Sequence, residues 1–441
     1  MRIRLGIDVG GTFTDLVLLE IESGAVLHTK VLTTAPDPAV GVVTAIGKAL
    51  GEHGIAATEI ADLRHGTTIA TNAMLERRGV PTALVTTKGF RDVLEIGRQI
   101  RPSLFDWFAD KPEPLVPRRR RFELDERVSA GGEVTRAPAD DEVAAVVERV
   151  AATGVEAVAV CFLFSFLRPE HEERVAAALR ERLPNAAISI SARVLPEYRE
   201  YERTSTTVAN AYLTPVVARY VSSLERSVDA LGLASKLQLL QSNGGLAGAA
   251  SARDRAVTTA LSGPAGGVTA AAYLARLAGS PDVISMDMGG TSCDVCLIRD
   301  GQSTWTVESR IGGLPVRIPM LNVNAVGAGG GSLIWIDTGG ALRVGPRSAG
   351  GNPGPAGYGR GGSEPTVTDA HAVLGTVRPE YFADKGITFD VDASRRVLER
   401  IGGAFGLDVR STALGALRVT NHNLAQAIRA VSVRKGYDPR D

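Results

Sequence analysis

The stretch Leu5-Gly-Ile-Asp-Val-Gly-Gly-Thr-Phe-Thr-Asp-Leu-Val-Leu-Leu19 decides the fold. Apolar and β-branched residues flank a Gly10-Gly11-Thr12 turn, which predicts a β-hairpin. The same pattern returns 279 residues further on as Ile284-Ser-Met-Asp-Met-Gly-Gly-Thr-Ser-Cys-Asp-Val-Cys-Leu-Ile298. Six positions are identical at this offset: Asp8 and Asp287, Gly10 and Gly289, Gly11 and Gly290, Thr12 and Thr291, Asp15 and Asp294, and Leu18 and Leu297. This match indicates an internal duplication and therefore two related domains.

Each turn has the residues of an anion-binding nest. A strand that ends in aspartate and turns through two glycines presents successive backbone N–H groups to a phosphate, and a Cβ at these positions would block its approach. The hydroxyls of Thr12, Thr14, Thr291 and Ser292 add donors. Asp8 and Asp287 could hold the water shell of Mg²⁺, which keeps several waters when proteins bind it. The alternative is that each segment is only a tight hairpin.

Two further glycine-rich segments are candidates for anion binding. Gly327, Gly329, Gly330 and Gly331 follow an apolar run, and such a loop can cradle a phosphate. A surface loop without a ligand is the alternative. The segment Ser262–Gly267 precedes an alanine-rich helix and is either a helix-start anion site or a hinge.

Composition excludes several classes of protein. The chain has 441 residues, which predicts two to four domains. Lysine plus arginine equals aspartate plus glutamate, 49 each, so the net charge of zero disfavours nucleic-acid or polybasic membrane binding. The most apolar stretch, residues 155–167, is too short to span a bilayer. Three cysteines and no signal-peptide pattern favour the cytoplasm.

Strand and helix patterns alternate along the chain, which predicts an α/β fold. Helices are expected at residues 36–54, 140–153, 169–183 and 197–230, the last interrupted near Pro215. Residues 343–362, rich in glycine and proline, are expected to form a long loop. A boundary between Leu183 and Pro196 divides the chain into domains 1–190 and 196–441.

The cysteines and histidines give only weak evidence for a metal site or a catalytic residue. Cys293 and Cys296 form a CxxC, but side chains at i and i+3 of a strand point to opposite faces, which argues against a shared metal. His65 begins a polar His-Gly-Thr-Thr segment, expected to be a loop. Its side chain is a candidate catalytic group, and a structural role is the alternative.

The paired Asp-x-Gly-Gly-Thr loops resemble those of the actin, Hsp70 and sugar-kinase ATPase superfamily. From Arg4 to its last residue the chain is more closely similar to the hydantoinase A / 5-oxoprolinase family. The similar stretches are residues 6–15, 65–72, 87–99, Glu200-Tyr-Glu-Arg-Thr-Ser-Thr206, 242–245, 287–292, 327–332 and 353–360. Together they are highly specific.

The resemblance implies two RNase-H-like domains with a nucleotide cleft between them, the second domain incomplete. It also implies ATP and Mg²⁺ as cofactors, a cyclic amide substrate such as hydantoin, 5-oxoproline or a lactam, and a hydantoinase B-type partner subunit. Asp8, Asp287 and His65 would be the catalytic residues, and Asp8 and Asp287 the metal ligands. The alternatives are a ketone carboxylase subunit, a small-molecule kinase and a non-catalytic ATP clamp.

Residues 434–441 resemble the family's lead-in to a further strand and glycine loop on the adenosine side of the site. The resemblance therefore implies that this chain alone binds ATP weakly.

Overall fold

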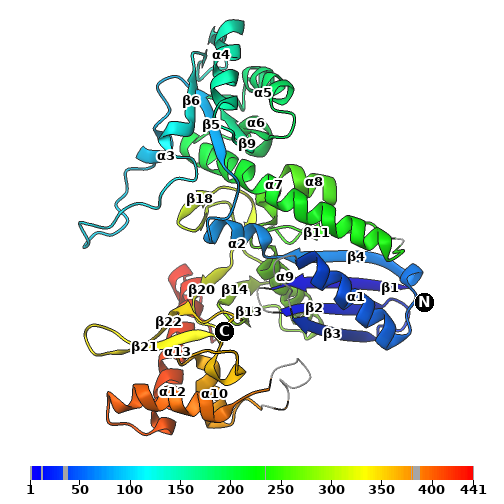
Figure 1. Cartoon of the computed structure of the whole chain (residues 1–441), viewed down its shortest axis with the longest axis vertical. Helices are drawn as coiled ribbons and strands as arrows, with labels where there is room; N and C mark the ends of the chain where they lie inside the picture. The colour runs from blue at the N-terminus through cyan, green and yellow to red at the C-terminus, as the bar shows by residue number, and fades with distance from the viewer. Residues whose placement is uncertain are drawn as a thin grey trace. The chain divides into compact units, whose positions relative to one another are not determined.

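The computed structural model describes residues 2–10, 13–32, 38–233, 235–378, 380 and 388–440. Gly11 and Thr12 thus lie outside the described residues. The chain is an α/β protein that divides into two compact units (Figure 1). The first unit comprises Met1–Ala56, Gly263–Trp305 and Leu321–Asp441, and the second comprises Ala57–Ser262 and Thr306–Met320. Both units are discontinuous in sequence, and helix α7 (Glu200–Ala230) packs in the second unit with segments that precede it. The domains 1–190 and 196–441 stay a prediction.

The first unit begins with the predicted hairpin. Strands β1 (Ile3–Val9), β2 (Phe13–Glu20) and β3 (Val26–Leu32) form an antiparallel meander, and helix α1 (Pro38–His53) packs across it (Figure 1). Alternate residues of β1 are buried, as period-2 patterning predicts. The helix lies where residues 36–54 were expected to form one.

The second copy of the pattern forms the second hairpin of the same unit. Strand β13 (Val283–Met288) pairs with β14 (Cys293–Arg299), which also pairs with β15 (Gln302–Ser303) and β20 (Asn324–Val326). Helix α9 (Ser262–Leu277) packs on the face of β14 that carries Cys296. Helix α13 (Val409–Val431) packs on the opposite face, which carries Cys293. The two cysteines therefore point to opposite faces, as predicted.

The remainder of the first unit is a small sheet covered by helices. Strands β21 (Ser332–Ile336) and β22 (Leu342–Ser348) pair, and helices α10 (Val367–Leu374), α12 (Val391–Gly403) and α13 enclose a core with them. Strand β22 occupies residues for which the sequence predicts a loop. The loop begins only after Ser348.

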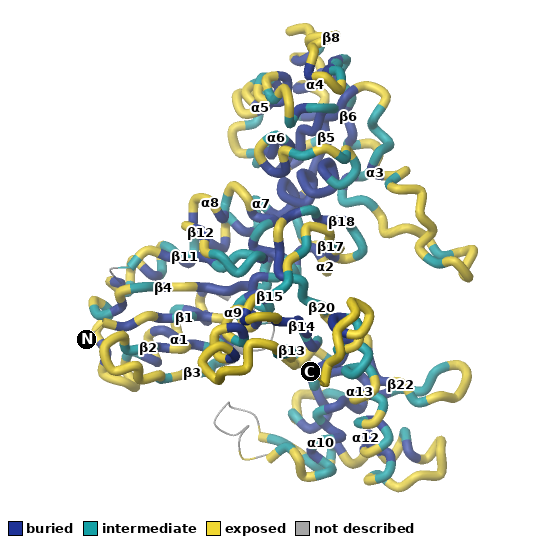
Figure 2. Tube along the Cα trace, turned by 180° about the vertical axis from the view of Figure 1, so that it is seen from behind, coloured by how far each residue is buried: buried dark blue, intermediate teal, exposed yellow. Residues whose placement is uncertain are grey.

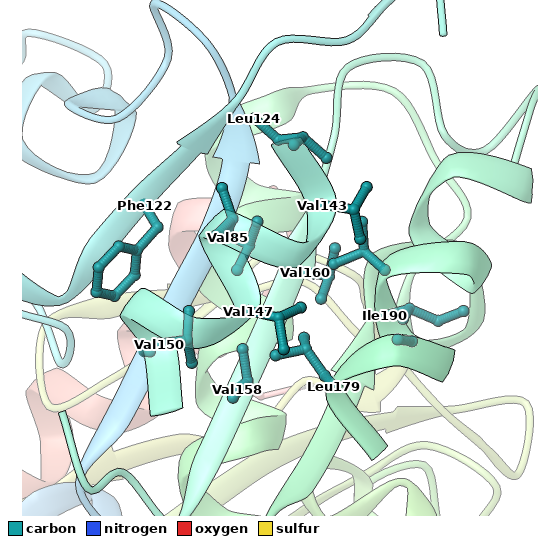
Figure 3. Close-up of a cluster of buried hydrophobic side chains, with 14 of the residues drawn as sticks. Val85, Phe122, Leu124, Val143, Val147, Val150, Val158, Val160, Leu179 and Ile190 are labelled. Atoms are coloured by element: carbon teal, nitrogen blue, oxygen red, sulfur yellow. The ribbon is translucent and has the colours of Figure 1, made fainter. Parts of the chain in front are cut away.

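A four-stranded parallel sheet forms one part of the second unit. Its order is β10 (Ala187–Ile190), β9 (Ala157–Cys161), β5 (Thr82–Thr87) and β6 (Arg121–Leu124). Helices α4 (Asp140–Ala151) and α5 (Glu170–Arg182) cover one face. Figure 3 shows the valine-rich core between this face and the helices, including Val85, Val147 and Val160.

Helix α7 links this sheet to the rest of the second unit. It continues through Pro215 without the predicted interruption. In this unit β4 (Ile60–Thr67) pairs with β11 (Leu237–Leu240), and β11 with β12 (Leu246–Gly248). The other helices are α2 (Ile69–Leu75), α3 (Val93–Ile96), α6 (Ser191–Val194) and α8 (Ala249–Asp254). The short strand pairs are β7 (Arg127–Val128) with β8 (Val134–Arg136), β17 (Ser309–Ile311) with β18 (Leu314–Val316), and β16 (Trp305–Thr306) with β19 (Met320–Leu321).

Among the residues that the structure describes, no helix is both long and apolar enough to cross a membrane.

Candidate functional site

The two hairpins have the same strand register. Asp8 lies opposite Asp15 in the first hairpin, and Asp287 lies opposite Asp294 in the second. Shifting the first ladder by 279 residues, from the Arg4–Leu19 pair onward, reproduces the second; Gly6 pairs with Val17, for example, and Ser285 with Cys296. The two copies of the sequence pattern therefore share one backbone pairing, as the predicted duplication requires.

Asp8 lies among like charges in the first unit. Its side chain still reaches solvent, but the protein atoms around it remove much of its hydration. This burial raises the pKa of Asp8 to about 6, and repulsion from Asp15 and Asp287 adds to the rise. Lys30 opposes it, with Nζ 2.6 Å from Asp15 Oδ1. One cation is thus near several carboxylates.

In the second hairpin the raised pKa belongs to the other aspartate of the opposed pair. Burial, with added repulsion from Asp287, raises the pKa of Asp294 to about 6. Asp287 itself is exposed, and so are Gly289, Gly290 and Thr291 in the following turn. A Cβ built on Gly267, in the first turns of α9, would lie 3.3 Å from Asp287 Oδ2. The absence of a side chain at Gly267 lets the start of this helix approach the carboxylate.

The glycines at 329–331 contact the second turn directly. The N–H of Gly330 donates to the carbonyl of Gly289 at 3.0 Å, and the N–H of Gly331 donates to that of Gly290 at 2.6 Å. The N–H of Gly329 donates to Ser332 Oγ. A Cβ on Gly329 would lie 2.7 Å from the backbone carbons of Gly290 and Thr291, so only glycine fits here. These amides support the Gly289–Gly290 turn.

The other predicted ligand residues are less accessible. Thr14 is fully buried in β2, Gly10 and Ser292 are half-buried, and Gly327 is half-buried at the start of its loop. Thr12 and Gly11 cannot be placed because they lie outside the described residues. Among the candidate residues that the structure describes, the exposed ones are therefore Asp8 in the first hairpin, and Asp287 with the turn that follows it in the second.

Mg²⁺ fits the chemistry of this carboxylate set. Within the described part of the chain, no group of three histidine, cysteine, aspartate or glutamate residues is arranged to hold a metal ion by itself. Mg²⁺ is usually bound through one or two carboxylates, with waters and phosphate oxygens completing its octahedron. Burial raises the pKa of Asp8 and of Asp294, and repulsion from neighbouring carboxylates adds to the rise, so a bound cation would stabilise their charged forms.

His65 is placed differently from the expectation. The structure puts it inside strand β4 and fully buried, not in a polar loop. Its Nε2 lies 2.6 Å from the Tyr220 hydroxyl, which comes from α7 in the same unit. The residues after it continue the strand to Thr67 before α2 begins. These contacts favour the structural alternative for His65.

We therefore expect His65→Ala to destabilise the protein by about 1–3 kcal/mol, through the lost hydrogen bond and an unfilled space. Tyr220→Phe should cost about 1 kcal/mol, because it removes only the hydroxyl. Denaturant unfolding of both variants measures these effects. A His65→Ala variant of unchanged stability that had lost substrate-stimulated ATP hydrolysis, but not basal hydrolysis, would instead establish a catalytic role.

A buried polar network explains one family-like stretch whose role the sequence left unassigned. Arg203, from Glu200–Thr206, is almost fully buried and donates to Ser191 Oγ and the Phe162 carbonyl, each at 2.7 Å, and to Ser165. Glu172 is fully buried beside it, with Oε1 4.0 Å from Arg203 Nη1. The sequence did contain a signal for this network, because Arg203 is followed by four hydroxyl residues, Thr204–Thr207, within a long expected helix. The network ties α7 to the end of β9.

These observations define an α/β protein with duplicated aspartate–glycine hairpins gathered in one unit. Family models identify it further. The Hydantoinase/oxoprolinase model matches residues 203–441, and the model for the Hydantoinase/oxoprolinase N-terminal region matches residues 4–183. The chain belongs to the hydantoinase/oxoprolinase family.

Individual relatives agree with the family. The chain is 39% identical to an uncharacterized protein of Methanocaldococcus jannaschii, covering 100% of this chain and 66% of that protein. It is 38% identical to the caprolactamase subunit alpha of Pseudomonas jessenii, covering 99% and 64%. The crystal structure of that ATP-dependent caprolactamase superposes with a TM-score of 0.84 at 37% identity, again covering 99% and 64%. Nucleotide-free acetone carboxylase superposes with a TM-score of 0.88 at 26% identity, with the same coverages. The chain thus spans slightly less than two thirds of the length of these relatives.

Proposed function

We propose that this chain is the ATP-using part of an enzyme that hydrolyses a cyclic amide. The observation that carries the proposal is the matched register of Asp8–Asp15 and Asp287–Asp294, with Asp8 and Asp287 close enough to repel each other. Membership of the hydantoinase/oxoprolinase family and the likeness to an ATP-dependent caprolactamase support it. We further propose that each hairpin opens an RNase-H-like domain, as the duplication implies.

In this proposal the residues of the two hairpins hold Mg²⁺–ATP. Asp8 and Asp287 would hold the hydrated metal, and the amides of Gly10, Gly11, Gly289 and Gly290, together with the hydroxyls of Thr12 and Thr291, would bind the phosphates. The glycines at 329–331 keep the second turn in place, as their hydrogen bonds to it support. Bound Mg²⁺ would offset the charge that develops on the transferring phosphoryl group.

The chemistry follows from the weak electrophilicity of an amide. The amide oxygen attacks the γ-phosphorus of ATP, and ADP leaves. Water then adds to the activated carbon, and the ring C–N bond breaks as the nitrogen takes up a proton, which leaves an acyl phosphate. A second water hydrolyses the acyl phosphate to a carboxylate and releases phosphate. Catalysis of the first step rests mainly on positioning and electrostatic stabilisation, which the aspartates and backbone amides can supply.

We also propose a hydantoinase B-type partner subunit for the hydrolytic step. The related caprolactamase chain is named as a subunit, which supports this. The test is ADP release from Mg²⁺–ATP with 5-oxoproline, hydantoin or caprolactam, with and without the B-type subunit of the same genome. We expect one cyclic amide to stimulate ADP release. No stimulation by any member of the panel would contradict the proposal.

Binding of Mg²⁺–ATP should weaken as the pH falls below about 6. The pKa values of Asp8 and Asp294 are raised to about 6, so protons compete with the metal for these carboxylates below that pH. Each competing proton should cost about tenfold in affinity per pH unit. Calorimetric titrations at pH 5 and pH 7.5 measure the effect.

The control for this prediction is Asp8→Asn, because protonation of ATP itself affects both proteins equally. The pH dependence should be flatter in the variant than in the wild type. Identical slopes would show that Asp8 does not titrate against the metal.

A ketone carboxylase subunit is the second candidate. The TM-score of 0.88 to acetone carboxylase favours it, although the identity of 26% is lower than that to caprolactamase. The same ADP assay with acetone or acetophenone and bicarbonate distinguishes the two. ATP use that depends on both ketone and bicarbonate would favour the carboxylase.

A further inference from the structure

The segment Ile100–Asp110 of the second unit, which we call the apolar arm, exposes large apolar side chains to solvent. Figure 2 shows it as a long exposed stretch after α3. Five of its side chains are exposed: Ile100 by 67%, Leu104 by 77%, Phe105 by 93%, Trp107 by 77% and Phe108 by 93%. Single exposed apolar residues are common, but five within nine positions mark an interaction surface.

Local polar contacts hold the arm in shape. Ser103 Oγ accepts hydrogen bonds from the N–H groups of Phe105 at 3.3 Å and Asp106 at 3.1 Å. Asp106 Oδ1 accepts from the N–H of Phe108 at 3.0 Å. The Arg101 guanidinium lies 4.4 Å from the centroid of the Trp107 ring. The aromatic side chains are thus held outward by the backbone, which lowers the entropy lost when they are covered.

A hydrogen bond joins the residue that follows the arm to a residue that precedes it. Lys111 Nζ donates to the carbonyl of Ile96 at 2.9 Å. Residues at both ends of the arm line a pocket of about 1160 Å³, whose walls also include Gly97, Tyr201, Val208 and Leu314. The arm and the pocket therefore form a projection beside a hollow, to which a protein surface of complementary shape could fit.

Charge and composition indicate the kind of molecule that covers the arm. Two basic residues, Arg101 and Lys111, lie near three acidic ones, Asp106, Asp110 and Glu113. This balance disfavours nucleic acid and anionic membranes, since both require a surplus of positive charge. Trp, Phe and Arg are instead typical of protein–protein contacts.

We propose that the apolar arm docks into an apolar groove of the B-type partner subunit. The inference rests on the proposed function for the existence of that subunit. Phe105 and Phe108 are the main anchors, because they are the most exposed side chains of the arm. Trp107, stacked with Arg101, lies between them in the chain and is buried with them on binding.

The test uses this chain and the B-type subunit of the same genome, each purified. Phe105→Ser with Phe108→Ser should weaken the complex at least about 100-fold in calorimetric titration, because truncating one anchor typically costs roughly 30-fold. Val26→Ser with Val134→Ser, two other exposed apolar positions, is the matched control and should leave the affinity unchanged. The melting temperature and Mg²⁺–ATP binding of the isolated chain should not change in either variant.

Trp107 gives an independent readout. Binding should shift tryptophan emission to the blue, and Trp107→Phe should abolish that shift. Equal affinity of wild type and double variant, or no complex with the wild type, overturns the inference. Loss of self-association or of vesicle binding by the double variant would instead assign the arm to a second copy or to a membrane. A complex that forms through the arm but gives no amide-dependent ADP release would contradict the proposed function alone.

Discussion

Replacing Asp8 or Asp287 by alanine is expected to reduce ATP turnover by roughly 10³-fold. Each variant removes a carboxylate that we propose holds Mg²⁺, and losing one preorganised electrostatic contact to a transition state costs about 4 kcal/mol. Steady-state ADP release by the chain with its partner subunit measures the loss. The two variants should lose similar activity, because the two hairpins have the same register.

Asp8→Asn adds a readout that does not depend on activity. The folded-state pKa of Asp8 is about 6, above the usual 3.8, so ionised Asp8 destabilises the fold. The penalty is fully present above pH 6 and disappears as the pH falls through 6 toward 4. Asp8→Asn should therefore be more stable than the wild type at pH 7.5 and equally stable near pH 4, by denaturant unfolding.

The control for both effects is Asp392→Asn in α12, which removes the same charge from a highly exposed site of the same unit. It should change neither turnover nor the pH dependence of stability. Wild-type turnover in either alanine variant would refute the assignment of the metal site.

The hairpins could be predicted because they depend on local chemistry. Strand alternation and a glycine pair at the turn fix both β1–β2 and β13–β14, and their identity at one offset fixes the common register. Their burial could not be predicted in the same way. Ile7 of β1 is 4% exposed, whereas the equivalent Met286 of β13 is 52% exposed. In the same way, Val9 is 2% exposed and its equivalent Met288 is 38% exposed. Burial depends on what packs against a strand, and the strand sequence does not contain that information.

The spacing of motifs along the sequence also could not show which residues far apart in the chain contact each other in the fold. The amides of Gly330 and Gly331 donate to Gly289 and Gly290, about forty residues earlier in the chain. His65 was expected in a loop because its neighbours are polar, yet those residues extend β4 and Tyr220 contacts the ring. Both cases depend on tertiary contacts, as does the division of the chain into discontinuous units.

The buried network between α7 and β9 should have the largest effect on stability. Arg203→Met is expected to destabilise the protein by about 3–5 kcal/mol, because removing one partner of a buried pair leaves the other uncompensated. The remaining group, Glu172, is fully buried and accepts hydrogen bonds from the N–H groups of Phe162 at 2.8 Å and Ala192 at 2.9 Å. Denaturant unfolding at pH 7.5 measures the loss.

The same variant has a distinctive pH dependence. Burial already raises the pKa of Glu172, and the positive charge of Arg203 lowers it, so the variant should raise this pKa further. An acid with a raised folded-state pKa stabilises the fold as the pH falls, because the folded state then binds the proton more strongly. The deficit of Arg203→Met should therefore be smaller at pH 5 than at pH 8.

Two further variants distinguish the loss of the buried Arg203–Glu172 interaction from the effect of removing any arginine. Arg182 forms a two-pronged contact with Glu148 in the same unit, Nε to Oε1 at 2.7 Å and Nη2 to Oε2 at 3.1 Å, but this pair is exposed. Arg182→Met should cost less than about 1 kcal/mol, because water screens and replaces the interaction. Adding Glu172→Gln to Arg203→Met should recover part of the lost stability, since it removes the unpaired charge. Equal costs for the two arginine variants, or no recovery in the double variant, would show that packing of the Arg203 stem, and not its charge, holds α7 against the sheet.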